Sequence, residues 1–219
     1  MAGYTLIVGT RSWSSWSLRP FVALKATGAP FETVDIRLRQ TNHPTTREQI
    51  LQQSPAGKVP VLKIEENGGN LTVWDSLAIC ETLAERHPGA GLWPQDAAAR
   101  AMARSYACEM HSGFPDLRDQ LSMDFARKLD LPELREETKS QVARILDAWE
   151  FALATYKGEF LFGTLSVADC MYAPVVSRFL TYGVQTSAPV KAYMKRMMAL
   201  PAMQEWLKAA QAEVDTGIV

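Results

Sequence analysis

The sequence predicts an α/β domain followed by an all-α helical domain, and three observations support this prediction. Segments with strand and helix patterns alternate before residue 88 of the 219-residue chain. A stretch rich in glycine and proline follows at residues 88–96. Beyond it, apolar residues recur at helical spacing, and no segment has the pattern of a strand. We therefore expect domains at residues 1–87 and 97–219, with residues 88–96 as the linker.

The chain should open with a β-α-β unit. Residues 4–9 and 31–36 are strand-like runs that flank a helical pattern at residues 18–27. Pro20 would lie in the first turn of this helix, where proline is tolerated, and Gly28 would end it. Because a helix between two strands usually brings them together in parallel, we expect a parallel pair.

A short helix, a hairpin and a longer helix should complete this domain. We expect the short helix at residues 44–53. Strand patterns at residues 59–64 and 71–74 flank a turn, and its Asn-Gly pair at residues 67–68 supplies the positive φ angles that hairpins need. The closing helix should begin at residues 75–76 and end before a Pro-Gly pair.

The second half should consist of helices only. A helix is expected at residues 97–112, with a break at the Phe-Pro pair of residues 114–115 and a continuation at residues 117–125. The next helix should begin at the Leu-Pro pair of residues 131–132 and bury one stripe of its surface. The stripe contains Val142, Ile145, Leu146, Trp149, Leu153 and Tyr156.

The helix after Ser166 should be the buried centre of this half. Ser166 and Asp169 have the spacing of a capping box, with Asp in place of the usual Glu. The helix is apolar on nearly all sides, which is typical of a buried helix. Two last helices, at residues 190–200 and 202–212, should be divided at Pro201.

Composition and charge argue against several classes of function. The formal net charge is −1, so we expect no nucleic-acid partner. No apolar run approaches the ~20 residues that span a membrane, and we see no signal peptide, so we expect a cytoplasmic protein without a membrane partner. The three cysteines are scattered and the three histidines lack metal-ligand spacing. We therefore expect reduced thiols and no metal site.

Pro60 stands at the start of the first hairpin strand. Proline has no backbone N–H, so the neighbouring chain lacks a partner there. A cis bond before Pro60 would leave the backbone N–H and C=O of Val59 open to pair with an extended peptide. Only ~5–6% of X–Pro bonds in folded proteins are cis, so the sequence by itself favours a trans bond.

Asp75 and Ser76 allow two interpretations. Both residue types are common helix caps, and the spacing by itself favours this role. The alternative is a receptor for an amino acid. The N–H groups at a helix start and the Ser76 hydroxyl suit an α-carboxylate, and the Asp75 carboxylate suits an α-ammonium group.

Residues 55–62 (Pro-Ala-Gly-Lys-Val-Pro-Val-Leu) and 75–79 (Asp-Ser-Leu-Ala-Ile) resemble the glutathione site of the cytosolic glutathione transferases. Residues 158–163 resemble part of that family's C-terminal domain. The resemblance implies the glutathione transferase fold, which is a thioredoxin-like N-terminal domain followed by an all-α C-terminal domain. Members of the family are usually homodimers, so we expect a homodimer.

The resemblance also implies roles for individual residues. The bond before Pro60 would be cis, and Val59 would pair its backbone with the cysteinyl unit of glutathione. Lys58 would touch the tripeptide. Asp75 and Ser76 would hold its γ-glutamyl end.

Residues 11–20, between the first strand and the first helix, would form the active-site loop of a thioredoxin-like fold. A thiol like that of glutathione has a pKa of ~8.5, so little of it is thiolate at pH 7. A hydroxyl that donates to the sulfur contributes ~1.5–3 kcal/mol, which would lower the pKa of the thiol by ~1–2 units. A serine therefore suffices, without a His/Asp partner.

Residues 14–19 (Ser-Ser-Trp-Ser-Leu-Arg) resemble the Ser-Ser-Cys-Ser-x-Arg loop of the zeta class, the maleylacetoacetate isomerases. Carried over, Ser14 would activate the thiol and Ser15 would be its neighbour. Helix capping is the alternative for these serines, and it is the favoured role for Ser17. Trp16 stands at the cysteine position, where it would shape the pocket for the electrophile, and this departure leaves the isomerase chemistry open.

The loop and the segment around His111 also resemble a group of bacterial glutathione-transferase-like proteins. In the family this helix faces the active-site cleft, so His111 and Ser112 would touch the second substrate. A structural role is the alternative for His111. Arg39, His43 or Lys58 would meet the glycyl carboxylate of glutathione.

These resemblances predict a glutathione transferase-like enzyme that activates the thiol of glutathione, its co-substrate, for attack on a small apolar electrophile. The reaction would be conjugation, as in detoxification, or a glutathione-dependent isomerisation or dehalogenation. The alternative is a non-catalytic protein on the same fold that acts through protein–protein contacts. A reductase that uses a loop cysteine is disfavoured, because residues 11–17 contain no cysteine.

Overall fold

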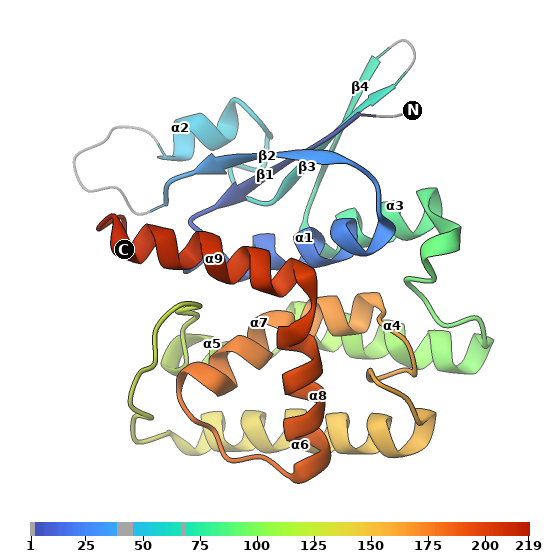
Figure 1. The fold of residues 1–219 in the computed structure, drawn as a ribbon, viewed down its shortest axis with the longest axis vertical. Helices are drawn as coiled ribbons and strands as arrows, with labels where there is room; N and C mark the ends of the chain where they lie inside the picture. The colour runs from blue at the N-terminus through green and yellow to red at the C-terminus, as the bar shows by residue number, and fades with distance from the viewer. Residues whose placement is uncertain (1–2, 39–45, 67–68) are drawn as a thin grey trace.

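The computed structural model describes residues 3–38, 46–66 and 69–219, and these form a sheet-containing half and a helical half (Figure 1). The strands are β1 (Gly3–Gly9), β2 (Phe31–Ile36), β3 (Val61–Glu66) and β4 (Gly69–Trp74). The helices of the first half are α1 (Ser15–Thr27), α2 (Thr46–Leu51) and α3 (Ser76–Arg86), and Pro88–Ala90 form a 3-10 helix. The helices of the second half are α4 (Ala97–Ser112), α5 (Pro115–Gln120), α6 (Glu136–Tyr156), α7 (Val167–Thr181), α8 (Ala188–Ala199) and α9 (Pro201–Asp215).

The four strands form one mixed sheet in the order β2-β1-β3-β4. β1 pairs in parallel with β2 and antiparallel with β3, and β3 pairs antiparallel with β4. The β-α-β opening and the hairpin strands predicted from the sequence are therefore confirmed. The Asn-Gly turn at residues 67–68 lies outside the described residues. The predicted division of the chain at residues 88–96 stays a prediction.

The two faces of the sheet are covered by different helices. α1 and α3 lie on one face and α2 on the other (Figure 1). Successive side chains of a strand point to opposite faces. Leu6 and Val8 of β1 therefore join the large core, while Ile7 packs with Ile36 and Ile50 in a small second cluster.

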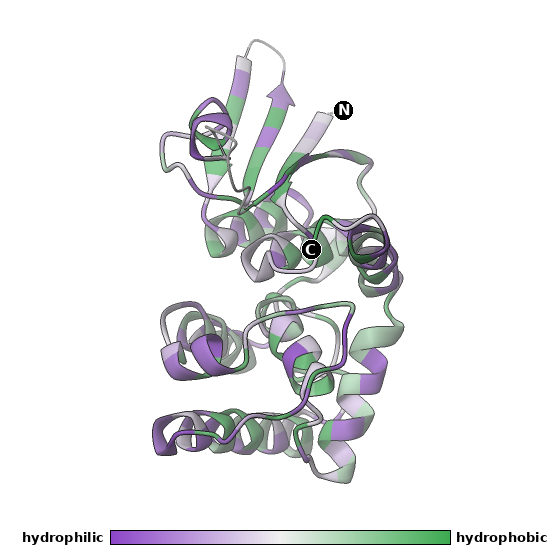
Figure 2. Cartoon of the chain, turned by 90° about the vertical axis from the view of Figure 1, so that its left-hand side faces the viewer, coloured by the Kyte–Doolittle hydropathy of each residue, from purple (hydrophilic) through white to green (hydrophobic). Residues whose placement is uncertain are grey.

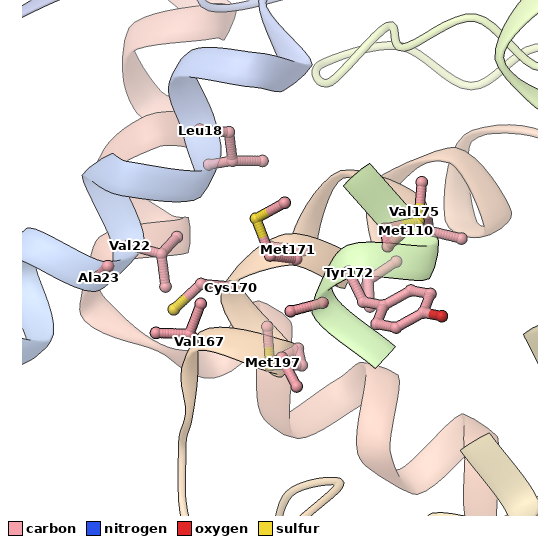
Figure 3. Packing of buried hydrophobic residues seen from close by; sticks show 14 of the residues in the cluster. Leu18, Val22, Ala23, Met110, Val167, Cys170, Met171, Tyr172, Val175 and Met197 are labelled. Carbon is pink, nitrogen blue, oxygen red and sulfur yellow. The ribbon is translucent and has the colours of Figure 1, made fainter. Parts of the chain in front are cut away.

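One hydrophobic core joins the two halves. Leu18 and Val22 of α1 pack near Val167, Cys170 and Met171 of α7 (Figure 3). Every residue of α7 except Leu180 is buried, which confirms that this helix is the centre of the helical half. The capping box at its start is present, with the Asp169 carboxylate accepting from the backbone N–H of Ser166 (2.9 Å). α1 is thus packed against the buried centre of the helical half.

The prediction that a helix begins at residues 131–132 is wrong, since α6 begins at Glu136. The side chain of Gln120 binds the intervening backbone. Its Nε2 donates to the carbonyl of Glu133 (3.2 Å), and its Oε1 accepts from the N–H of Arg135 (2.9 Å). These two backbone groups therefore bond to the Gln120 side chain and not to other backbone groups of a helix.

The predicted helix at residues 117–125 is also shorter, since α5 ends at Gln120. Side chains at the end of α7 bind the backbone carbonyls that would have continued it. Arg178 donates to the carbonyl of Leu121, and Thr181 donates to that of Asp124 (2.8 Å). The segment after α5 is therefore held against α7 in an irregular path.

The start of α1 differs from the prediction, while its end agrees. The helix begins at Ser15 and not at residue 18, so Pro20 lies inside it and not in its first turn. Gly28 ends the helix with a φ of 71°, the left-handed conformation that favours glycine. α2 is shorter than predicted, and part of the predicted range lies outside the described residues.

Hydrophilic and hydrophobic residues alternate along the strands and the helices (Figure 2). This pattern is typical of elements with one face in a core and the other in water. Among the described helices, none combines the length and the apolar character that a membrane span requires.

Candidate functional site

A cavity of about 500 Å³ lies where the loop before α1, the segment before β3, the start of α3 and the end of α4 meet. It is therefore bordered by both halves of the chain. Its lining residues are Trp13, Ser14, Trp16, Leu38, Ile50, Ala56, Gly57, Lys58, Val59, Pro60, Trp74, Asp75, Ser76 and His111.

The structure brings together eight of the site residues predicted from the sequence. These eight are Ser14, Trp16, Lys58, Val59, Pro60, Asp75, Ser76 and His111. They come from four separate stretches of the chain, so their meeting in one cavity is a tertiary result. The peptide bond between Val59 and Pro60 is cis, as the family resemblance implied and against the expectation from base frequency.

Two other candidates, Ser15 and Ser112, lie outside this cavity. Ser15 is buried and lines a second cavity. Ser112 is exposed, lines neither cavity, and donates its hydroxyl to the carbonyl of Cys108 (3.0 Å). Arg39 and His43, the candidates for the glycyl carboxylate, lie outside the described residues.

Ser14 occupies the N-cap position of α1, but its side chain does not cap the helix. Its hydroxyl donates to the hydroxyl of Ser17 (2.7 Å), which in turn accepts from the backbone N–H of Gly9 (3.2 Å). Ser17 is fully buried inside the first turn, so the capping role predicted for it is wrong. Sequence reasoning did not identify Gly9 as part of the site. A Cβ at this position would lie 3.0 Å from the Ser14 oxygen and closer still to the Leu38 side chain, so the space beside Ser14 requires a glycine.

Asp75 caps α3, as one of the two interpretations of the sequence predicted. Its Oδ1 accepts from the backbone N–H groups of Leu77 (2.9 Å) and Ala78 (3.2 Å). Its Oδ2 lies 3.2 Å from Nε2 of His111. Asp75 holds a φ of 74°, a conformation that costs non-glycine residues about 1–3 kcal/mol and often marks a functional site.

Ser76 carries a polar group without a partner. Its hydroxyl is buried and has no hydrogen bond among the described residues, although the residue lines the cavity. A buried hydroxyl without a partner costs about 1–3 kcal/mol. An acceptor or donor supplied by a ligand would remove this cost, so the arrangement fits the receptor interpretation for Ser76.

His111 lies between Asp75 and the ring of Trp16. The two aromatic rings meet edge to face, with centroids 5.3 Å apart. Burial lowers the pKa of His111, Asp75 raises it, and the positive charges of Arg19 and Arg118 lower it further. The net direction is downward, which favours the neutral imidazole near pH 7.

Two arginines flank Trp16, and sequence reasoning missed both. The guanidinium carbon of Arg19 lies 4.2 Å from the Trp16 ring centroid, and that of Arg118 lies 4.9 Å from it. Arg19 is fully buried without a hydrogen bond among the described residues, and burial together with Arg118 and Arg178 lowers its pKa to about 9. The i, i+3 spacing of Trp16 and Arg19 on one helix was the only local signal of this stack.

A second cavity, of about 340 Å³, is also lined by Trp13 and Trp16. These two rings border both cavities. The other residues that line it are Ser15, Arg118, Ser122, Met123, Asp124, Leu129 and Arg178. Its cationic side chains come from the helical half, in contrast to the first cavity.

The described residues contain no cluster of three or more histidine, cysteine, aspartate or glutamate side chains that could hold a metal ion. The polar groups that line the 500 Å³ cavity include the hydroxyls of Ser14 and Ser76, the carboxylate of Asp75 and the ammonium of Lys58. Such groups suit an organic ligand with amino and carboxylate ends.

Two family models match the chain. The model of the glutathione S-transferase N-terminal domain matches residues 13–86, and that of the C-terminal domain matches residues 132–209.

The chain is also similar to proteins of known name and structure. It is 31% identical to a maleylacetoacetate isomerase of Mus musculus, over 89% of this chain and 87% of the relative. It is 30% identical to a glutathione S-transferase omega-1 of Mus musculus, over 90% of this chain and 75% of the relative. A crystal structure of a glutathione transferase homolog from Burkholderia with bound glutathione superposes with a TM-score of 0.70 at 25% identity, covering 96% of this chain and 98% of that one.

Proposed function

Because the chain belongs to the glutathione S-transferase family, as its motifs predicted, we propose that it binds glutathione in the 500 Å³ cavity and activates the thiol for reaction with a small electrophile. The observation that carries this proposal is the buried Ser76 hydroxyl. It has no hydrogen-bond partner in the part of the chain that the structure describes, and Ser76 lines the same cavity as Asp75 and Ser14. The named relatives support the catalytic function over the non-catalytic alternative.

The two ends of this cavity would have different tasks. Asp75 and Ser76 would bind the γ-glutamyl ammonium and carboxylate, with the N–H groups at the start of α3 favouring the negative charge. Val59 would pair its backbone with the cysteinyl unit, and Lys58 would contact the tripeptide. The sulfur would then lie near Ser14.

Thiol activation would use the hydroxyl pair of Ser14 and Ser17. The thiol gives its proton to solvent, and the thiolate accepts a hydrogen bond from Ser14. Ser17, which accepts from the N–H of Gly9, can then donate to the Ser14 oxygen, because hydroxyl hydrogens rotate. The thiolate sulfur forms the new bond to the electrophile, and Ser14 itself stays uncharged and unmodified.

Two classes of reaction are proposed for the activated thiol. The similarity to a maleylacetoacetate isomerase supports glutathione-dependent isomerisation, and the similarity to an omega-1 transferase supports conjugation. Trp16 and His111 line the cavity beside Ser14, so they would contact the electrophile in either case.

We also propose an oligomeric state and a cellular compartment for the protein. We infer a homodimer, because the chain belongs to the glutathione S-transferase family. The molar mass in solution tests this, since a monomer would refute it. A cytoplasmic location agrees with three cysteines that are all free thiols.

Calorimetric titration with glutathione tests the binding proposal. We expect micromolar to low-millimolar affinity in the native protein, and about ten-fold weaker binding after Ser76→Ala, because one hydrogen bond to a charged ligand group is lost. Ser105→Ala is the matched control, since that serine is exposed and bonds only to its own helix. Absence of binding at millimolar glutathione would refute the proposal.

A further inference from the structure

The loop that carries Ser14 is held by the last helix of the chain. We infer that Glu213 of α9 is a positioning residue for thiol activation, although no residue of α9 lines the 500 Å³ cavity. The inference rests on the proposed function, because it assigns Glu213 to the placement of Ser14.

Every backbone polar group of Arg11 and Ser12 bonds to the helical half of the molecule. The carboxylate of Glu213 accepts from the N–H of Arg11 (2.6 Å) and from that of Ser12 (2.8 Å). The indole N–H of Trp206 donates to the carbonyl of Arg11 (2.8 Å). The N–H of Phe125 donates to the carbonyl of Ser12 (3.1 Å). The path of the loop at these two residues is therefore set by groups far away in the sequence.

Side chains reinforce the same attachment. The Ser12 hydroxyl donates to Glu213 (2.9 Å) and is also 3.3 Å from the carbonyl of Ala210. The guanidinium of Arg11 lies 4.6 Å from the ring centroid of Trp206 and forms two hydrogen bonds with Asp35 of β2 (2.6 and 3.0 Å). The loop thus bridges β2 and α9, and α9 itself packs against α1 (Figure 1).

The attachment lies two residues before Ser14. The N–H groups of Trp13 (3.1 Å) and Ser14 (2.8 Å) both donate to the carbonyl of Thr10, so residues 10–14 form one tight turn. A shift of Arg11 and Ser12 within this turn would move Ser14. Since a hydrogen bond weakens steeply as its geometry worsens, such a shift would reduce the stabilisation of the thiolate.

The chemistry of this contact requires a carboxylate. One carboxylate presents acceptors to two N–H groups at once, while a carboxamide presents one acceptor and an NH₂ donor. Glu213→Gln therefore keeps the size of the side chain and places a donor against one of the loop N–H groups. Glu205→Gln is the matched control, because Glu205 lies on the same helix in an exposed ion pair with Lys25.

The experiment compares the full-length native protein with both variants in two measurements. Hydrogen exchange of the free protein reports the protection of the amides of residues 11–12, and the ultraviolet absorbance of bound glutathione reports the pKa of its thiol. In Glu213→Gln we expect about ten-fold faster exchange and a thiol pKa higher by about 1 unit. We expect neither change in Glu205→Gln.

Each other outcome overturns a stated part of the inference. Unchanged exchange in Glu213→Gln would show that Glu213 does not hold the loop. Faster exchange with an unchanged thiol pKa would show a purely structural contact and overturn the positioning role. If the native protein does not bind glutathione, the proposed function fails, and the exchange data still decide whether Glu213 holds the loop.

A second variant covers the case in which Glu213→Gln does not fold. Trp206→Phe removes the donor to the carbonyl of Arg11 and keeps an aromatic ring in the core. We expect the same two changes with smaller size. A native thiol pKa in this variant, together with faster exchange at residues 11–12, would overturn the inference.

Discussion

Two helix starts border the same cavity, and they are built in different ways. The start of α3 is capped locally, because Asp75 binds the N–H groups of the next residues in the chain. The start of α1 has no side-chain cap, and the loop before it is held by Glu213, about 200 residues away. If glutathione binds as proposed, there is a division of labour: local sequence fixes the end of the cavity that binds it, and tertiary contacts fix the end that activates its thiol.

Ser14→Ala should have the largest effect, because it removes the donor at the activating end. We expect the pKa of the bound glutathione thiol to rise by about 1–2 units, which lowers the rate at pH 7 by about ten-fold or more. The dissociation constant for glutathione at pH 7 should rise by no more than about four-fold, because only the ionised fraction of the bound thiol loses a contact. Absorbance titration of the thiolate and calorimetry measure the two quantities.

The corresponding change at the binding end, Ser76→Ala, should do the reverse. It should weaken glutathione binding and leave the pKa of the bound thiol unchanged. Equal effects of both variants on affinity and on the thiol pKa would refute the division of labour.

Two substitutions of Asp75 separate its role as the cap of α3 from its role as a negative charge for the ligand. We expect their effects to be smaller than that of Ser14→Ala. Asp75→Asn keeps an oxygen that can cap α3 and removes the negative charge. Asp75→Ala removes both. We expect only Asp75→Ala to lose about 1 kcal/mol of unfolding free energy, from the lost cap.

Both Asp75 variants should weaken glutathione binding to a similar degree, because both lack the partner of the γ-glutamyl ammonium. Denaturant unfolding and calorimetry provide the measurements. If Asp75→Asn binds glutathione as the native protein does, the carboxylate has only the structural role.

His111 should produce the smallest effect, a dependence of stability on pH. Its pKa in the folded protein is lowered, mainly by burial, from the ordinary value of 6.5. The unfolded chain therefore binds the proton more readily than the folded one between these two pKa values, so stability rises with pH through that range and is lost as the pH falls. His111→Gln should flatten this part of a plot of melting temperature against pH, and an unchanged slope would contradict the assignment.

Local sequence determined much of the architecture and the binding end of the candidate site. The strands, the Gly28 stop, the capping box of α7 and the cap at Asp75 depend on residues a few positions apart, so their patterns are visible in the sequence. The family motif around Pro60 also predicted residues that line the cavity, namely Lys58, Val59 and Pro60. Where tertiary contacts compete with local preference, the predictions were wrong, as for the start of α6, which Gln120 sets.

The tertiary structure decided the arrangement around Ser14, the residue beside which the proposed function places the sulfur. It placed Ser15 at the second cavity and made Ser17 the hydrogen-bond partner of Ser14. It brought the guanidinium groups of Arg19 and Arg118 close to the Trp16 ring. It also brought Glu213 to the loop before α1. These contacts join residues from distant segments or depend on how a helix is rotated in the core, and neither is encoded in the spacing of neighbouring residues. The sequence by itself determined the family, most of the elements and the ligand class, because these depend on motifs and on residues a few positions apart. Only packing determined which hydroxyl faces the cavity and what holds it there.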